Sequence, residues 1–448
     1  MTARTVFLAG VAAAVAIAFA DSSIVVLALP ELYGRFDTSI EGVAWVITSY
    51  NLVLAVVALA LVFVVHRVRA GPLLAAGAVV FLGSSIACAS SNSIGVLIAA
   101  RSVQGLGGAL LLAGSLPVLE PLAGSTARGI AVWTMAGTLG AALGPALGGV
   151  LTQAFDWRAI FVFQAPVAGL ALLGAVGSHE PAMLEEGWTA RLGRSMPANL
   201  GLALLSGALV GALFLGVILV IDVFGLTPLQ GAAVVSAIPI ATLLAGPIAS
   251  SLPVPLAVCS GAGLLAGGLI GLAFLPSSAL GYAIASFALC GFGLGLSVPG
   301  LTHAVLGTGG GREGTLTVGV RHLGLVLALA VVAPLLTGDL FAAEDVARLN
   351  GTSVVIDGRI PATTKVPLAL DIRDTIDSAP RGEIPDLASV FDEHGAREDP
   401  EVRAVQDDLM AAVEAAVTRA FRSSFLFCAV LALLALGPIL AFRRRLEP

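Results

Sequence analysis

Residues 16–30 read AIAFADSSIVVLALP, an apolar run that carries a single carboxylate, Asp21. A hydrocarbon core about 30 Å thick is crossed by a helix of about 20 apolar residues, and this run with its flanks reaches that length. The whole chain is 57% hydrophobic and only 12% charged, with a mean hydropathy of +0.98. Soluble domains carry about a quarter charged residues, so we predict an integral membrane protein. The short segments of alternating polarity typical of membrane barrels are missing, which favours an all-α bundle.

About twelve apolar stretches of spanning length follow one another. Their approximate centres are residues 17, 54, 81, 108, 140, 168, 210, 240, 265, 290, 330 and 432. The first stretch imitates a signal peptide, but its apolar sequence continues to Leu29, so we expect it to remain as the first span. Polar residues 178–198 form a linker between an N-terminal six-helix bundle, 1–177, and a C-terminal one, 199–448.

The arginines of the short loops predict the orientation of the chain, because cytoplasmic loops are enriched in positive charge. One side would collect Arg4, Arg67, Arg69, Arg128, Arg191, Arg194, Arg312 and Arg443 to Arg445, and the other only Arg35 and Arg158. We therefore expect a multi-pass protein of the cytoplasmic membrane with both termini in the cytoplasm. Lys365 is the only lysine, and this preference for arginine indicates a GC-rich bacterial source.

A long polar segment, residues 342–422, separates the last two spans on the outer side. It holds 16 acidic and 9 basic residues, so the net charge of −6 of the whole chain originates here. Asp399 and Pro400 are a helix-start signal, and Val402, Val405, Leu409, Val413 and Val417 then recur at helical spacing. This predicts an amphipathic helix running into the last span. The segment would serve as a lid on the bundle or, alternatively, as a docking site for an extracytoplasmic protein.

Three charges lie within the spans: Asp21, Arg101 and, near an outer end, Asp222. An ionisable group at this depth costs several kcal/mol unless it is paired or faces water, so each is a candidate functional residue. Asp21 could carry a proton, balance a cationic substrate or form a fixed ion pair; neighbouring hydroxyls could also satisfy it structurally. Arg101 stays charged at any useful pH and needs a cavity, carbonyl groups or a carboxylate.

Enzyme chemistry is not expected. The four cysteines lie in apolar runs, no His, Cys, Asp or Glu cluster has metal spacing, and nothing aligns a hydrolytic triad. The sequence GTLGAALGPALGG at 137–149 lacks the strand–loop–helix setting of a phosphate loop. We therefore predict no catalytic residue, metal, cofactor or nucleic-acid partner. The glycines at 137, 140, 144, 148 and 149 instead form a stripe that allows close helix packing, with Pro145 permitting a bend.

Several motifs together resemble the drug:proton antiporters of the major facilitator superfamily, in particular the branch known mainly for fourteen-helix members. They are ADSSIVVLALPEL in the first span, WVITSYNL (45–52), RSVQGLGGA from Arg101, the glycine stripe followed by DWRAIF (156–161), LTPLQG (226–231) and RHLG (321–324). A weak internal repeat, residues 104–119 against 290–306, fits the repeated halves of such transporters. The chain departs from this branch because the two extra central helices are missing.

The loop between the second and third spans also departs from the superfamily pattern. Its usual aspartate aligns with His66, Arg67 remains, and a glycine position is Arg69. In the superfamily that aspartate helps to latch the outward-open state. The resemblance therefore leaves the gating role of this loop open here, although it does not affect the expected fold.

The resemblance implies two six-helix bundles that rock around a central cavity and exchange protons for a small lipophilic compound. Asp21 would be the proton site with Arg101 beside it, and a water-accessible cavity would reach Asp21. Tyr50, Asn51, Gln104 and Asp222 would line the cavity, and the glycine stripe would join the halves. Two other functions stay open: a lipid or glycolipid exporter that uses the outer segment for cargo or a partner, and a non-transporting sensor or scaffold. We expect a monomer in the lipid bilayer.

Overall fold

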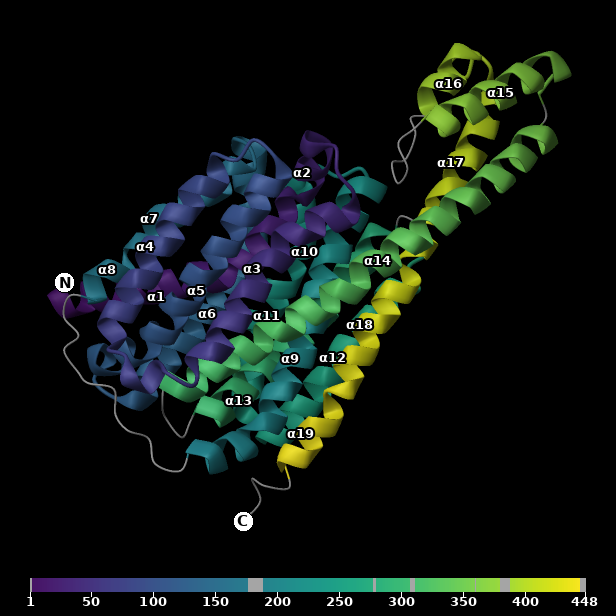
Figure 1. The fold of residues 1–448 in the computed structure, drawn as a ribbon. Coiled ribbons are helices and arrows are strands. Elements are labelled where there is room, and N and C mark those ends of the chain that lie inside the picture. Colours follow the sequence, from purple (N-terminus) through teal and green to yellow (C-terminus); the bar gives the residue numbers. More distant parts are fainter. Residues whose placement is uncertain are drawn as a thin grey trace.

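The computed structural model describes residues 2–175, 188–276, 279–306, 311–358, 360–378 and 387–443. All regular elements in these ranges are helices. Twelve helical segments are long and apolar enough to cross a membrane. This confirms the predicted all-α membrane fold and the number of spans. Figure 1 shows the spans as one bundle, with both chain termini at one end and a helical extension beyond the other.

Six spans form the N-terminal half. They are α1 (Ala3–Ile24) continued by η1 (Val25–Ala28) and α2 (Leu29–Phe36), then α3 (Ile40–Leu61), α4 (Ala70–Ala89), α5 (Ile94–Ala123), α6 (Thr126–Ala154), and α7 (Arg158–Gly169) with α8 (Ala171–Ala175); the short turn η2 (Val65–Arg67) follows α3. Serine side chains cap the starts of α3, α5 and α6 by accepting a backbone N–H, as N-caps do. The first span changes to a tighter helical turn at Val25, shortly before Pro30, which has no N–H to donate.

The C-terminal half also contains six spans. They are α9 (Trp188–Ile218) with η3 (Leu219–Val223), α10 (Pro228–Val235) with α11 (Ala237–Ser251), α12 (Val254–Ala273), α13 (Leu280–Leu306), the first part of α14 (Gly311–Asp357), and α17 (Pro400–Ala420) continued by α18 (Arg422–Leu434) and α19 (Leu436–Arg443). Residues 178–187 of the predicted linker lie outside the described residues. The rest of that linker already belongs to α9, which begins at Trp188 rather than at 199.

The helical extension comprises, in the described ranges 344–358, 360–378 and 387–420, the second part of α14, α15 (Ala362–Ser378), α16 (Leu387–Glu393) and α17. Figure 1 shows it projecting along the axis of α14 and α17. It has an apolar core of its own: Val355, Ile360, Leu368, Ile372, Leu387, Val390, Phe391, Ala396, Val402, Val405 and Leu409. The predicted amphipathic helix is confirmed as α17, capped by Asp399, which accepts from the backbone N–H of Glu401. The segment is therefore a small folded unit and not an open connector.

The glycine stripe packs α6 against α1 within the N-terminal half. A Cβ at Gly140 would lie 1.9 Å from the carbonyl oxygen of Ala16, and one at Gly148 would lie 2.2 Å from that of Ile24. Gly137 and Gly144 likewise face Phe19 and Ser23 of α1. The prediction that the stripe joins the two halves is therefore wrong for these four glycines, because residues three or four apart share one helix face and that face meets α1.

The two halves touch each other at both ends of the bundle. At the end with the termini, Nε of Arg312 in α14 donates to the carbonyl oxygen of Val62 at 2.7 Å. Gly319 of α14 lies against Leu59 on the same side. At the end with the extension, a Cβ at Gly149 would lie 2.1 Å from the Cβ of Ala232 in α10. We call these contacts the terminal-end and extension-end closures.

Candidate transport site

A buried ion pair lies inside the N-terminal half. Nη1 of Arg101 in α5 is 2.6 Å from Oδ2 of Asp21 in α1, and both side chains are fully buried. The same nitrogen donates to Oδ1 of Asp21 at 2.7 Å. Nε of Arg101 donates to the carbonyl oxygen of Val46 at 3.0 Å, and its guanidinium stacks 4.5 Å above the ring of Tyr50. The pair thus neutralises two charges that neither helix could bury alone.

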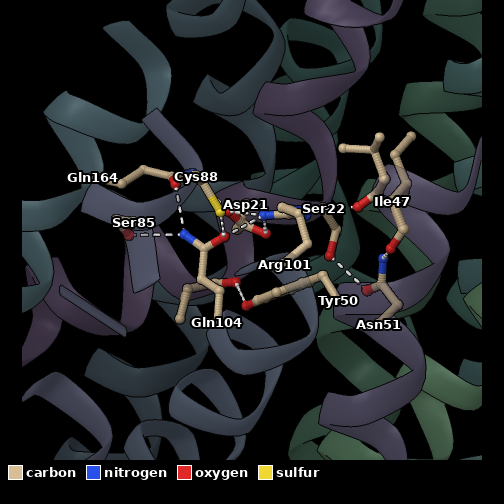
Figure 2. Close-up of polar contacts among 12 residues, drawn as sticks. Asp21, Ser22, Ile47, Tyr50, Asn51, Ser85, Cys88, Arg101, Gln104 and Gln164 are labelled. Atoms are coloured by element: carbon tan, nitrogen blue, oxygen red, sulfur yellow. Dashed lines mark hydrogen bonds and ion pairs between the residues drawn. The ribbon is translucent and has the colours of Figure 1, made fainter. Parts of the chain in front are cut away.

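Two glutamines extend this pair into a polar network, drawn in Figure 2. Nε2 of Gln164 in α7 donates to Oδ1 of Asp21 at 2.7 Å. Gln104 accepts from Arg101 at 2.7 Å and donates to both Ser85 and Gln164, at 2.8 and 3.0 Å. Four helices of one half therefore contribute to this network: α1, α5 and α7 meet at Asp21, and α4 joins through Ser85 and Gln104. Gln164 was not predicted as a site residue, although an amide in the apolar span 158–175 is a visible signal in the sequence.

A cavity of about 890 Å³, part of it open to solvent, lies between the halves. Its walls come from α1 and α6 of the first half and from α9, α11, α13 and α14 of the second. The lining residues are Phe19, Ser22, Ser23, Thr138, Ala141, Ala142, Pro145, Ser206, Leu209, Val210, Leu213, Ile238, Pro239, Thr242, Leu294, Val298, Pro299, Arg321, His322 and Leu325. A mainly apolar wall with a few polar groups is typical of sites for small amphipathic molecules.

Asp21 lies behind this cavity and does not line it. Ser22, the next residue, does line it, because one residue turns the helix by about 100°. The predicted water-accessible route to Asp21 is therefore closed in this conformation. Oδ1 of the carboxylate accepts hydrogen bonds from Arg101 and Gln164, and Oδ2 lies within ion-pair distance of Arg101.

The residues predicted to line the cavity also lie elsewhere. Tyr50, Asn51 and Gln104 are fully buried and face the interior of the N-terminal half. The hydroxyl of Tyr50 donates to the carbonyl oxygen of Ala18 at 2.9 Å, and Asn51 accepts from Ser22 at 2.8 Å (Figure 2). Asp222 is exposed in η3 and is not part of the cavity wall. Tyr50, Asn51 and Gln104 lie behind the cavity wall because their positions on the helix turn them toward neighbouring helices.

Arg321 and His322 lie on the C-terminal side of the cavity. Nε of Arg321 donates to the hydroxyl of Ser206 at 3.1 Å, and its guanidinium is 5.4 Å from the centre of the Phe19 ring. Nδ1 of His322 is 2.8 Å from the carbonyl oxygen of Val318, so this nitrogen carries the proton. The motif RHLG had drawn attention to both residues, but no role was predicted for them. Helical periodicity in an apolar span does not reveal which residues face a partner half.

The loop after α3 lies at the terminal-end closure. His66 is half-buried, whereas Arg67 and Arg69 are exposed. Partial burial and the positive charges of Arg312 and Arg67 lower the pKa of His66 below its ordinary value. His66 is therefore neutral at neutral pH and makes no ion pair with the arginines beside it.

No group of three or more His, Cys, Asp or Glu residues in the described ranges could hold a metal ion. All four cysteines are free.

The sequence matches a model of the Major Facilitator Superfamily over residues 11–334. It is 33% identical over 181 residues to the drug efflux pump JefA of Mycobacterium tuberculosis, covering 39% of this chain and 36% of that protein. The multidrug resistance protein Stp of the same organism is 36% identical over 157 residues, covering 34% and 29%. The matched regions thus amount to about a third of the length of each relative.

A solved structure supports the fold. The inward-facing, unoccupied structure of a bacterial homolog to the human lysosomal transporter Spinster superposes with a TM-score of 0.60, covering 99% of this chain and 98% of that one. The sequence identity is 16%, so this likeness concerns the fold alone. The family model covers most of the chain, and twelve spans surround a central cavity as the family fold requires. The chain belongs to the Major Facilitator Superfamily.

Proposed function

We propose that the protein exports small amphipathic or lipophilic compounds in exchange for protons, with both termini in the cytoplasm. The central cavity carries this proposal: it lies between the halves, has mainly apolar walls and is flanked by a closure at each end. Opening one closure while the other holds would expose the cavity to one side of the membrane at a time. The similarity to proteins named as a drug efflux pump and a multidrug resistance protein supports the same function.

Asp21 is the proposed proton-coupling residue, and Arg101 is its positioning partner. Protonation of Asp21 would remove its charge and release its hold on Arg101, so it would couple proton binding to a rearrangement of α1 and α5. The position supports this: Ser22 and Ser23 of the same helix turn line the cavity. A change in the ion pair could therefore reach the cavity wall through less than one helical turn.

The test uses proteoliposomes with an imposed pH gradient and a trapped pH indicator. A lipophilic compound is added, either the cation ethidium or the uncharged phenylnaphthylamine, and proton flux is compared between the wild type and the Asp21→Asn variant. The matched control is Asp37→Asn, which removes an exposed carboxylate at a left-handed position that asparagine tolerates. We expect proton flux that depends on the added compound in the wild type and the control and none in Asp21→Asn. Transport of that compound that persists fully in Asp21→Asn would remove this residue from the coupling role.

A lipid or glycolipid exporter remains the second candidate, because the helical extension has its own core and rises from α14 and α17. Such a unit could receive an apolar cargo outside the bundle. Flux of a fluorescent lipid across the same vesicles, in place of ethidium flux, would favour this candidate.

A further inference from the structure

Arg321 is the one charged side chain among the described residues that line the cavity. Its Nε donates to Ser206, and its guanidinium rests beside the ring of Phe19. The two terminal nitrogens have no hydrogen bond, and the group has no carboxylate within ion-pair distance, in the part of the chain that the structure describes. Arg101 differs in this respect, because its charge is met by Asp21 at 2.6 Å.

The rest of the described cavity wall offers no acidic group to balance Arg321. The hydroxyl of Ser22 donates to Asn51, that of Thr138 to the carbonyl of Thr134, and that of Thr242 to the carbonyl of Gly291. These hydroxyl hydrogens are therefore already used in bonds within or between helices. A cationic molecule in the cavity would meet a fixed positive charge and no opposite charge, whereas an anion would meet an arginine with two free donor nitrogens.

We propose that the cavity binds amphipathic anions, with Arg321 holding an oxyanionic head group and the apolar wall holding the body. The proposal rests on the proposed function in one respect, namely that the central cavity is the substrate site. A carboxylate, sulfonate or phosphate suits the forked guanidinium, which can donate two parallel hydrogen bonds. Leu209, Leu213 and Val298 lie in the same wall and suit an aromatic or aliphatic body.

The test compares two probes with one aromatic body, anilinonaphthalene sulfonate and the uncharged phenylnaphthylamine. Fluorescence binding is measured with the full chain in lipid nanodiscs, and empty nanodiscs give the lipid background. The variants are Arg321→Gln, which removes the charge, and Arg321→Lys, which keeps it but loses the fork. Arg128→Gln removes an exposed arginine at the start of α6 and serves as the matched control.

We expect the wild type to bind the sulfonate more tightly than the neutral probe. Arg321→Gln should weaken sulfonate binding by about tenfold to a hundredfold, the range for a charged hydrogen bond, and leave the neutral probe unchanged. Arg321→Lys should lie between the two, and Arg128→Gln should match the wild type. Equal loss of both probes in Arg321→Gln would overturn the proposal, because it would indicate a structural role.

The wild type alone also tests the proposal if a variant fails to fold. Equal affinity of the wild type for the two probes would overturn it. Where Arg321→Gln does fold, a sulfonate affinity that survives in this variant would overturn it as well. Ethidium-dependent proton flux together with no preference for the anion would overturn the anion site while leaving the transporter intact. Anion binding that depends on Arg321 without flux of any compound would support the site and count against the proposed transport function.

Discussion

Asp21 and Arg101 form an ion pair at 2.6 Å with neither side chain exposed, although the two residues are 80 positions apart in sequence. Both charges are thus shielded from bulk solvent. The pair is therefore held together by its own geometry and by the donors and acceptors around it. Substitutions at Asp21 and Arg101 should therefore change the stability of the fold, apart from any effect on transport.

Removing one member of this pair should destabilise the protein more than removing both. Arg101→Gln leaves Asp21 as an uncompensated buried carboxylate, and loss of one partner of a buried pair costs about 3–5 kcal/mol. The double variant Asp21→Asn/Arg101→Gln removes both charges and should recover much of that loss. The measurement is the free energy of unfolding of the purified wild type, single variant and double variant in the same detergent. Additive losses in the double variant would show that the two charges are not coupled.

Close packing of α6 on α1 should depend on Gly140. A Cβ at this position would lie 1.9 Å from the carbonyl oxygen of Ala16, so Gly140→Ala forces the helices apart. Overpacking of this kind costs about 1–3 kcal/mol. Gly83→Ala in α4 is the matched control, because nothing lies within 4 Å of its added Cβ and alanine favours helix. The midpoint temperature of thermal unfolding should fall for Gly140→Ala only. An equal fall for Gly83→Ala would contradict the packing argument.

The sequence was sufficient to predict features that depend on local pattern. Apolar runs of spanning length gave twelve spans, and the Asp399–Pro400 start signal gave α17, because each depends on neighbours along the chain. The likeness of the first-span motif and of the motif at Arg101 to the drug:proton antiporters pointed to the family whose model matches residues 11–334.

The orientation of individual side chains within the bundle was not predictable in the same way. The spans are apolar on most faces, so periodicity does not show whether a residue faces the cavity, another helix or lipid. The family resemblance implied a cavity position for Tyr50, Asn51 and Gln104, and the apolar periodicity could not test it; for the same reason no role was predicted for Arg321. The glycine stripe was correctly read as a packing face, but the helix that meets it depends on tertiary arrangement.

The two closures should be opened separately by wedges at Gly149 and Gly319. A Cβ at Gly149 would lie 2.1 Å from that of Ala232, and one at Gly319 would lie 2.8 Å from Cγ of Leu59. Gly149→Val should therefore open the extension end, and Gly319→Val should open the terminal end. Each variant serves as the control for the other, because the substitution is the same and only the end differs.

Spin-label distances measure both openings in a background without the four native cysteines. Labels at Asp37→Cys and Leu229→Cys report the extension end, and labels at Arg128→Cys and Ser251→Cys report the terminal end. Gly149→Val and Gly319→Val should each lengthen the label distance at their own end. The label distance at the opposite end should stay unchanged or become shorter. Lengthening at both ends with either wedge would indicate general loosening and contradict the idea of two independent closures.

Acid should weaken the terminal-end closure through His66. Its pKa is lowered in the closed form by partial burial and by Arg312 and Arg67, so the closed form disfavours the protonated ring. The closure is then fully favoured above the ordinary histidine pKa of about 6.5 and loses free energy as the pH falls below it. His66→Asn should remove this dependence, whereas His66→Asp places a carboxylate beside two arginines and should strengthen the closure at neutral pH. The distance between labels at Arg128→Cys and Ser251→Cys, measured from pH 7.5 to 5, distinguishes these variants. If the distance still changes with pH in His66→Asn, another group causes the pH dependence.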